Sequence, residues 1–161
     1  MPNQLEIIAE PGKPSIQFRR TFDAPRELVW EALTKPEHVR RWYGPRRMTT
    51  VVCDMDFRVG GKWRVVFRTP DGREAGFNGE YLLIEAPVKM SQTWRFEMFP
   101  NATSVKTMEL EAQSDRTVMR GTVTHTSVEN RDAHVGSGME DGARETYERL
   151  DELLAELAAA K

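Results

Sequence analysis

The sequence predicts an α+β fold in which a curved, seven-stranded antiparallel sheet wraps around one long C-terminal helix. Three observations support this prediction. Short segments of alternating apolar and polar residues recur between turn residues from residue 48 to residue 127. One long segment, 139–157, repeats apolar residues at helical spacing. Two helix-start signals lie within residues 23–45, directly after the first predicted strand.

Size and composition indicate one domain at residues 15–160, preceded by an irregular lead-in at residues 1–14 that carries three prolines. The chain has 161 residues, 30% of them charged, and a formal net charge of -2. A balanced charge without a basic face argues against nucleic-acid binding. No apolar run approaches the roughly 20 residues that span a bilayer, so we expect no membrane insertion.

Cysteine and histidine are scarce and scattered. Cys53 is the single cysteine, so no internal disulfide can form, which suits a reducing cytoplasm. The N-terminus lacks the basic start and apolar stretch of a secretion signal. Three histidines spread along the chain do not have the spacing of a metal site. We therefore expect a cytoplasmic protein with neither metal nor cofactor.

Two short helices are predicted after a first strand at residues 15–22 (SIQFRRTF). Asp23 is placed to cap the first helix, which has Pro25 in its first turn. A capping box at residues 34–37 opens the second helix, and a glycine–proline pair ends it. Neither helix is long enough to be stable alone in water, so both must pack against the sheet.

Six more strands are predicted, separated by turns. They occupy residues 48–57, 62–68, 76–85, 89–98, 104–113 and 116–127. In the second of these, Trp63, Val65 and Phe67 fall on one face and charged residues on the other, as in a half-buried antiparallel strand. Strands joined by short turns predict a meander with one dry face and one wet face.

Residues 128–136 are predicted to be a polar loop, and a second capping box, at residues 137–140, then begins the long C-terminal helix. This helix carries the one long apolar stripe that can cover the dry face of the sheet. Because a strongly twisted sheet cannot lie flush along a straight helix, the two must diverge toward one end. We expect the short helices to close that gap and to leave a pocket between sheet and helix.

Four stretches of the sequence resemble the SRPBCC, or START-like, superfamily. They are FDAPRELVWEALTKPEHVRRWYGP, VGGKWRVVFRTPDG, FNGEYLLIEAPVKMSQTWRF and GMEDGARETYERLDELL. More narrowly, residues 15–158 are similar to the branch described as activator of heat-shock protein 90 ATPase homologue-like. The resemblance implies the helix-grip fold, with a deep hydrophobic cavity between the sheet and the terminal helix.

The resemblance implies a fold but does not fix an activity. Members of the superfamily bind lipids, hormones or polyketides, some are cyclases or aromatases, and the branch is named after a co-chaperone domain. The eukaryotic co-chaperone has a separate N-terminal domain, which the 14 residues of the lead-in cannot replace. We therefore expect the partner of this protein to be a small ligand rather than a chaperone. The sequence is compatible with a monomer or a homodimer.

The candidate cavity residues are large apolar side chains on the predicted inner faces, with a few smaller and polar neighbours. They are Trp30, Trp42, Cys53, Met55, Trp63, Val65, Phe67, Phe77, Tyr81, Gln92, Trp94, Phe96, Met108, Met119, His125, Met139, Ala143, Thr146, Tyr147 and Leu150. Each one alone fits an ordinary core, where burial contributes about 1.5–3 kcal/mol. As a set they favour a pocket, since Trp and Tyr bring N–H and O–H groups and methionine adapts to irregular ligands. A dry void of about 300 Å³ would cost about 7 kcal/mol, so it must be narrowed, wetted or filled by a ligand.

His125 is the one candidate general acid or base among the inner-face residues. No serine–histidine–acid or cysteine–histidine spacing accompanies it, so no catalytic residue is assigned. The alternative is a core histidine with satisfied hydrogen bonds, beside a buried Cys53 thiol that acts as a small apolar group.

Two sets of charged residues are further candidate sites. Asp54 and Asp56 alternate with Cys53 and Met55, so we expect both carboxylates to face solvent. A basic cluster surrounds the second helix and comprises Arg40, Arg41, Arg46 and Arg47. We expect a solvated rim there, with an anion site at the pocket mouth as the alternative.

Three functions fit these patterns. The favoured one is a binding protein that holds a small hydrophobic or amphipathic molecule in the cavity without catalysis. The first alternative is a polyketide cyclase/dehydratase-like enzyme that uses the same cavity, with His125 or Tyr147 as a proton shuttle. The second alternative is a co-chaperone-like or regulatory interaction domain.

Overall fold

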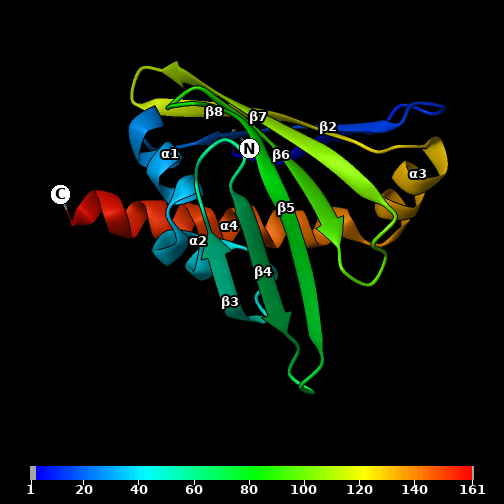
Figure 1. Ribbon diagram of the computed structural model, residues 1–161. Helices are drawn as coiled ribbons and strands as arrows, with labels where there is room; N and C mark the ends of the chain where they lie inside the picture. The colour runs from blue at the N-terminus through cyan, green and yellow to red at the C-terminus, as the bar shows by residue number, and fades with distance from the viewer. Residues whose placement is uncertain (1–2, 161) are drawn as a thin grey trace.

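The computed structural model describes residues 3–160, which form one antiparallel sheet and a set of helices on its concave side (Figure 1). The strands are β1 (Glu6–Ile8), β2 (Ser15–Phe22), β3 (Thr49–Met55), β4 (Lys62–Arg68), β5 (Glu74–Glu85), β6 (Lys89–Phe96), β7 (Thr103–Gln113) and β8 (Arg116–Thr124). The helices are α1 (Arg26–Thr34), α2 (Pro36–Trp42), α3 (Val128–Gly136) and α4 (Met139–Ala159). None of the helices within residues 3–160 has the length and hydropathy needed to cross a membrane.

The sheet confirms the predicted α+β meander. Its strand order is β1-β2-β8-β7-β6-β5-β4-β3, so β3 to β8 follow one another and β2 closes onto the last strand. β2 and β4 coincide with the segments predicted from alternation. The described part of the sheet has eight strands, one more than predicted, because Ile7 of the lead-in pairs with Phe18. A three-residue strand is too short to show an alternating pattern.

Residues 128–136 form helix α3, so the predicted polar loop is wrong. Ser127 caps the helix by accepting a hydrogen bond from the Asn130 backbone N–H at 3.0 Å. The one buried side chain of α3 is Arg131, which donates to the Ser15 carbonyl oxygen at 3.1 Å. An arginine anchor leaves no apolar stripe, which is why hydrophobic periodicity missed the helix.

The side chains predicted to cap the other helices bind elsewhere. Asp23 accepts hydrogen bonds from Asn3 at 2.7 Å and Arg116 at 2.8 Å, which links the N-terminal segment to β8. Thr34 donates to the Trp30 carbonyl oxygen, and Ser137 donates to the carbonyl oxygen of His134. The helices nevertheless start near the predicted residues, because packing rather than capping holds them.

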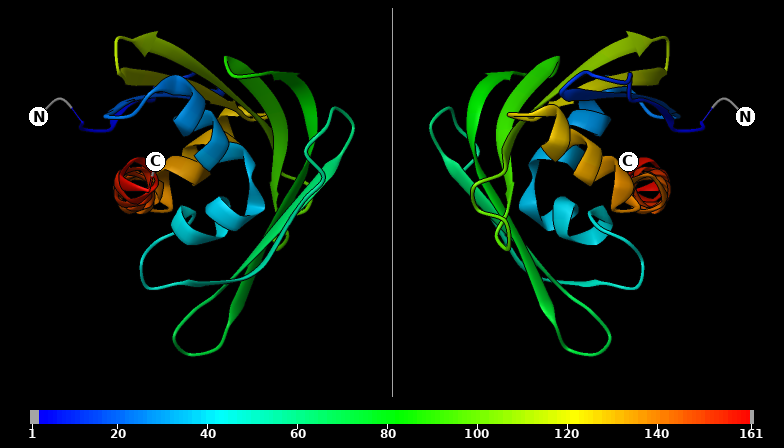
Figure 2. Two further views of the ribbon diagram at one scale, coloured as in Figure 1. Left: turned by 90° about the vertical axis from the view of Figure 1, so that its left-hand side faces the viewer. Right: turned by 90° about the vertical axis from the view of Figure 1, so that its right-hand side faces the viewer.

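Helix α4 lies along the open side of the curved sheet, and α1 and α2 fill the space between them at one end (Figure 2). The C-terminal half of α4 buries Leu150, Leu153 and Leu154 in the main core. The helix contacts α1 and α2, which in turn contact β7, β8 and β3. The short helices therefore hold α4 away from the sheet, as the twist of the sheet predicts.

Polar contacts lock α4 in this position. Arg149 donates to the carbonyl oxygens of Gly44 at 2.8 Å and Arg41 at 2.6 Å. Arg41 pairs with Glu156, and Arg46 pairs with Glu152. The four arginines of the predicted rim are exposed, and two of them are thus bound to α4.

Arg20 of β2 and Asp151 of α4 form an ion pair. Among the ion pairs of residues 3–160, it is the one that joins these two elements. The guanidinium is 5% exposed, its Nη2 lies 2.5 Å from the carboxylate, and its Nη1 donates to the Thr21 carbonyl oxygen. It also lies 4.9 Å from the centre of the Phe22 ring. Burial raises the pKa of Asp151, and Arg20 opposes that rise. The carboxylate therefore depends on its arginine to stay charged.

Replacing Arg20 by methionine should lower the free energy of unfolding by about 2–3 kcal/mol at pH 7, because a desolvated Asp151 carboxylate then lacks its cation. Without Arg20 the pKa of Asp151 rises further, so the folded state takes up a proton at higher pH than the unfolded chain. The loss should therefore shrink as the pH falls from 7 to 5, which urea unfolding at both pH values measures.

The matched control adds Asp151→Asn to Arg20→Met, which removes the unpaired charge and should recover most of the loss at pH 7. A loss that is equal at both pH values, or that Asp151→Asn leaves in place, would contradict this account.

Candidate functional site

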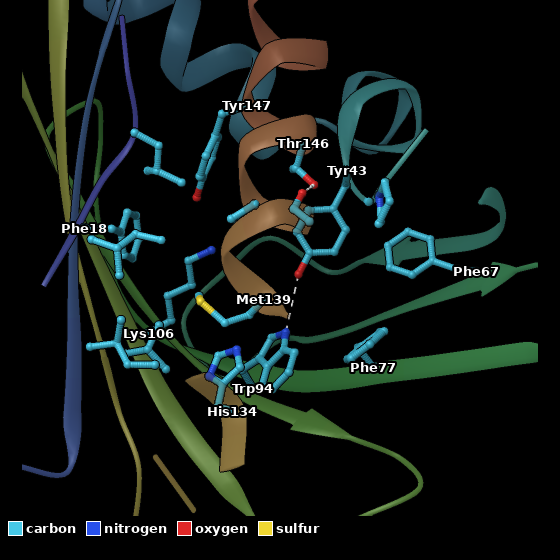
Figure 3. A pocket seen from close by; sticks show the side chains of 18 residues that line it. Phe18, Tyr43, Phe67, Phe77, Trp94, Lys106, His134, Met139, Thr146 and Tyr147 are labelled. Atoms are coloured by element: carbon cyan, nitrogen blue, oxygen red, sulfur yellow. Dashed lines mark hydrogen bonds between the residues drawn. The ribbon is translucent and has the colours of Figure 1, made fainter. Parts of the chain in front are cut away.

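A cavity of about 190 Å³ lies between the sheet and the N-terminal half of α4 (Figure 3). The helix contributes a row of residues from its first turns, namely Met139, Gly142, Ala143, Thr146 and Tyr147. Seven strands, all those described except β3, and the end of α3 supply further lining residues. The cavity thus occupies the part of the sheet–helix space that the short helices leave open.

One wall of the cavity is a continuous row of neighbouring aromatic rings, most of them stacked. The ring centroids are 5.5 Å apart for Tyr43 and Phe67, 5.7 Å for Phe67 and Phe77, and 5.1 Å for Phe77 and Trp94. His134 continues the row, parallel to Trp94 at 5.5 Å. The Trp94 indole N–H donates to the Tyr43 hydroxyl at 3.4 Å, so this pair closes the row on itself (Figure 3).

Gly44 makes this wall possible. Its φ of +96° lies in the left-handed region, which ends α2 and turns the chain toward β3. A Cβ at this position would lie 2.7 Å from Cε1 of Phe67. Any larger residue would push the loop off Phe67 and would displace Tyr43 from the ring beneath it.

Tyr147 dominates the opposite wall. Its ring is stacked with Phe18 at 6.3 Å and with Trp42 at 6.3 Å, and it meets Phe22 edge-on. Burial raises the pKa of its hydroxyl well above the ordinary value, so the group remains a neutral phenol. The hydroxyl points into the cavity (Figure 3) and has no hydrogen-bond partner within residues 3–160.

Two histidines meet at the end of the cavity next to α3. Nε2 of His125 lies 3.0 Å from Nδ1 of His134, so one nitrogen donates to the other. Burial, followed by the charges of His125 and Lys106, lowers the pKa of His134 to about 4, and burial also lowers the pKa of His125. Both rings are therefore neutral at neutral pH. Only His134 lines the cavity, since His125 lies behind it.

The predicted inner-face residues fall into three groups. Phe67, Phe77, Trp94, Met139, Ala143, Thr146 and Tyr147 line the cavity described above. A separate void of about 50 Å³ is lined by Trp42, Met55, Trp63, Val65, Tyr81, Gln92 and Met108. Trp30, Cys53, Phe96, Met119, His125 and Leu150 line neither space.

Residues outside both spaces have structural surroundings. Met119 and Leu150 are fully buried in the core. Trp30 packs edge-on against Phe57, and the buried Cys53 thiol lies 3.7 Å from a backbone carbonyl oxygen, with a pKa that burial raises. Asp54 and Asp56 are both exposed, which confirms the prediction that their carboxylates face solvent. Within residues 3–160, no group of three or more His, Cys, Asp or Glu side chains could hold a metal ion.

Sequence reasoning missed four prominent lining residues. Phe18 and Lys106 lie on predicted strands, Tyr43 follows the second short helix, and His134 lies in the segment predicted as a loop. Alternation along residues 104–113 places Lys106 on the same face as Met108, so the pattern indicates its direction. Lysine side chains are mostly exposed, so Lys106 was not predicted on the inner face of the sheet.

We expect His134→Gln to flatten the pH dependence of stability between pH 7 and pH 5. The pKa of about 4 in the folded state lies below the ordinary 6.5, so the unfolded chain takes up a proton first as the pH falls. Stability from the neutral ring is therefore present above pH 6.5 and is lost toward pH 4, with about 2 kcal/mol lost by pH 5. Unfolding of both proteins at a series of pH values measures the two slopes, and equal slopes would show that His134 does not titrate in this way.

Comparison with known proteins places the chain in a family. The family described as activator of Hsp90 ATPase homolog 1-like protein matches residues 23–155. No curated protein matches the chain significantly.

Solved structures show the same fold. A Rhodobacter sphaeroides protein is 30% identical with a TM-score of 0.86, covering 96% of this chain and 99% of that one. An Arthrobacter aurescens protein is 30% identical with a TM-score of 0.84, covering 94% and 91%. The Nitrosomonas europaea protein NE0264 is 26% identical with a TM-score of 0.81, covering 90% and 96%. The chain therefore belongs to the family of activator of Hsp90 ATPase homolog 1-like proteins.

Proposed function

We propose that the protein binds a small hydrophobic or amphipathic molecule in the 190 Å³ cavity and carries or sequesters it without catalysing a reaction. Family membership supports a ligand-binding or regulatory domain. The observation that carries the proposal is a cavity with aromatic walls and a few polar groups that point into it. Small-molecule sites have this composition.

The energetics of the cavity support a ligand. At about 24 cal/mol per Å³, 190 Å³ left empty would lower stability by about 4–5 kcal/mol, a large share of what a domain has. Larger side chains at two small positions of α4 would fill the space. A Cβ at Gly142 would come no closer than 3.8 Å to Pro45, so the backbone there has room for one. A cavity of about 150 Å³ can hold benzene, so this one admits a molecule with one ring and a short chain.

The protonation states favour binding over chemistry. A general base works best when its pKa lies near the working pH, whereas the pKa of His134 is about 4. The raised pKa of Tyr147 likewise makes its hydroxyl a poor proton donor at neutral pH. The enzyme alternative would now depend on His134, because His125 does not line the cavity.

The test is a binding assay on a cavity-filling variant. Ala143→Phe places a ring in the cavity, and Ala155→Phe makes the same change on an exposed position of the same helix. Small arenes such as indole and 3-phenyl-1-propanol should raise the unfolding temperature of the wild type and of Ala155→Phe but not of Ala143→Phe. A probe at 100 times its dissociation constant should add about 2.7 kcal/mol to the free energy of unfolding.

Two outcomes would contradict the proposal. Probes that stabilise Ala143→Phe as well as the wild type would bind outside the cavity. If no probe from a panel of small arenes and medium-chain alcohols stabilised the wild type, an interaction domain would be the better account.

A further inference from the structure

Lys106 is the only charged side chain among the described residues that line the two internal spaces. It lines the 190 Å³ cavity and also the smaller 50 Å³ void. Its ammonium lies 5.5 Å from the centre of the Phe18 ring and forms neither an ion pair nor a hydrogen bond within residues 3–160. Neither lining includes an aspartate or a glutamate. A cation with an aromatic face as its only partner thus lies inside an apolar pocket.

The position of Lys106 follows from the strand. Ser104 and Met108 share its face of β7, and both are buried. The acidic residues of the same strand point to the opposite face, where Glu109 pairs with Lys89 and Glu111 pairs with Arg120. Alternation therefore keeps every nearby acid of β7 away from Lys106. Lys106 is half-buried and has no ionic partner, so an apolar side chain at this position should stabilise the free protein.

Three arginines near the cavity already have partners. Arg41 and Arg46 pair with glutamates of α4, and Arg149 donates to the backbone carbonyl oxygens of Arg41 and Gly44. Arg40 and Arg47, the other two arginines of the predicted rim, are exposed and line neither space, so Lys106 is the cation that lines the cavity itself. Tyr147 lines the same cavity, where its hydroxyl points toward the Lys106 ammonium (Figure 3) and likewise has no hydrogen-bond partner in the described chain.

We propose that the ligand of this cavity is a small aromatic carboxylic acid, whose carboxylate binds the Lys106 ammonium and accepts a hydrogen bond from the Tyr147 hydroxyl. This inference rests on the proposed ligand-binding function. The aromatic ring of the acid lies against the row of Tyr43, Phe67, Phe77 and Trp94, since offset stacking between aromatic rings is favourable.

The charge and the volume of the cavity narrow the class of ligand further. One ammonium balances one negative charge, whereas a phosphate monoester would bring a second charge into a pocket without another cation. A cavity of about 190 Å³ is only slightly larger than one of about 150 Å³ that holds benzene, so it suits one ring with a chain of a few atoms. Arylalkanoic acids of the size of 3-phenylpropionate satisfy both conditions.

The test compares an acid and a matched neutral molecule by isothermal titration calorimetry. The two probes are 3-phenylpropionate and 3-phenyl-1-propanol, which share the ring and the chain. The wild type should bind the acid about tenfold or more tightly than the alcohol, since a charge-assisted hydrogen bond replaces a neutral one. Lys106→Met should remove this preference and keep the affinity for the alcohol.

Lys62→Met is the matched control, because Lys62 is exposed on the outer face of β4. It should retain the full preference for the acid. Without ligand, Lys106→Met should also unfold at a higher temperature than the wild type, while Lys62→Met should not. If Lys106→Met fails to fold, Lys106→Gln, which keeps a polar but neutral side chain, takes its place.

The outcomes separate this inference from the proposed function. Equal affinity of the wild type for acid and alcohol would overturn the carboxylate assignment and leave a binding cavity. Tight binding of the acid that survives in the Lys106 variant would place the anion elsewhere and overturn it as well. Binding of neither probe to the wild type would argue against the proposed function itself.

Discussion

The separation between the curved sheet and helix α4 is the constraint on which the rest of the structure depends. A twisted sheet touches a straight helix over only part of its length, and α1 and α2 occupy the space at one end. Arg20, Arg41, Arg46 and Arg149 then tie α4 to β2 and to the region around α2, so the helix cannot tilt down onto the sheet. The cavity is the space that remains at the other end.

The polar groups of the cavity differ in their chemical capacity. His134 and Tyr147 are held neutral by burial, so they can offer hydrogen bonds but have little tendency to exchange protons at neutral pH. Lys106 offers a charge instead, and the strand directs the nearest acids to the other face. Unfavourable features of a free protein often mark where a ligand completes the structure. A cation among aromatic rings is such a feature.

Much of the fold could be predicted from the sequence, because alternation and helical spacing record which face is buried. The boundaries of β2 and β4, the two short helices and the long terminal helix follow from these patterns. α3 could not be predicted, since its anchor is the buried Arg131 and not an apolar stripe. The cavity positions of half-buried residues with polar ends, such as Tyr43, Lys106 and His134, were not predicted either, because such residues form no apolar pattern. Their positions depend on contacts between distant segments, which a local pattern does not contain.

A crystal structure of the protein with 3-phenylpropionate would test the central claim most directly. The account predicts a ring between Tyr147 and the row formed by Phe77 and Trp94, with the carboxylate at hydrogen-bond distance from Nζ of Lys106. The acid on the outer surface, or a cavity closed by its own side chains in the presence of saturating acid, would contradict it.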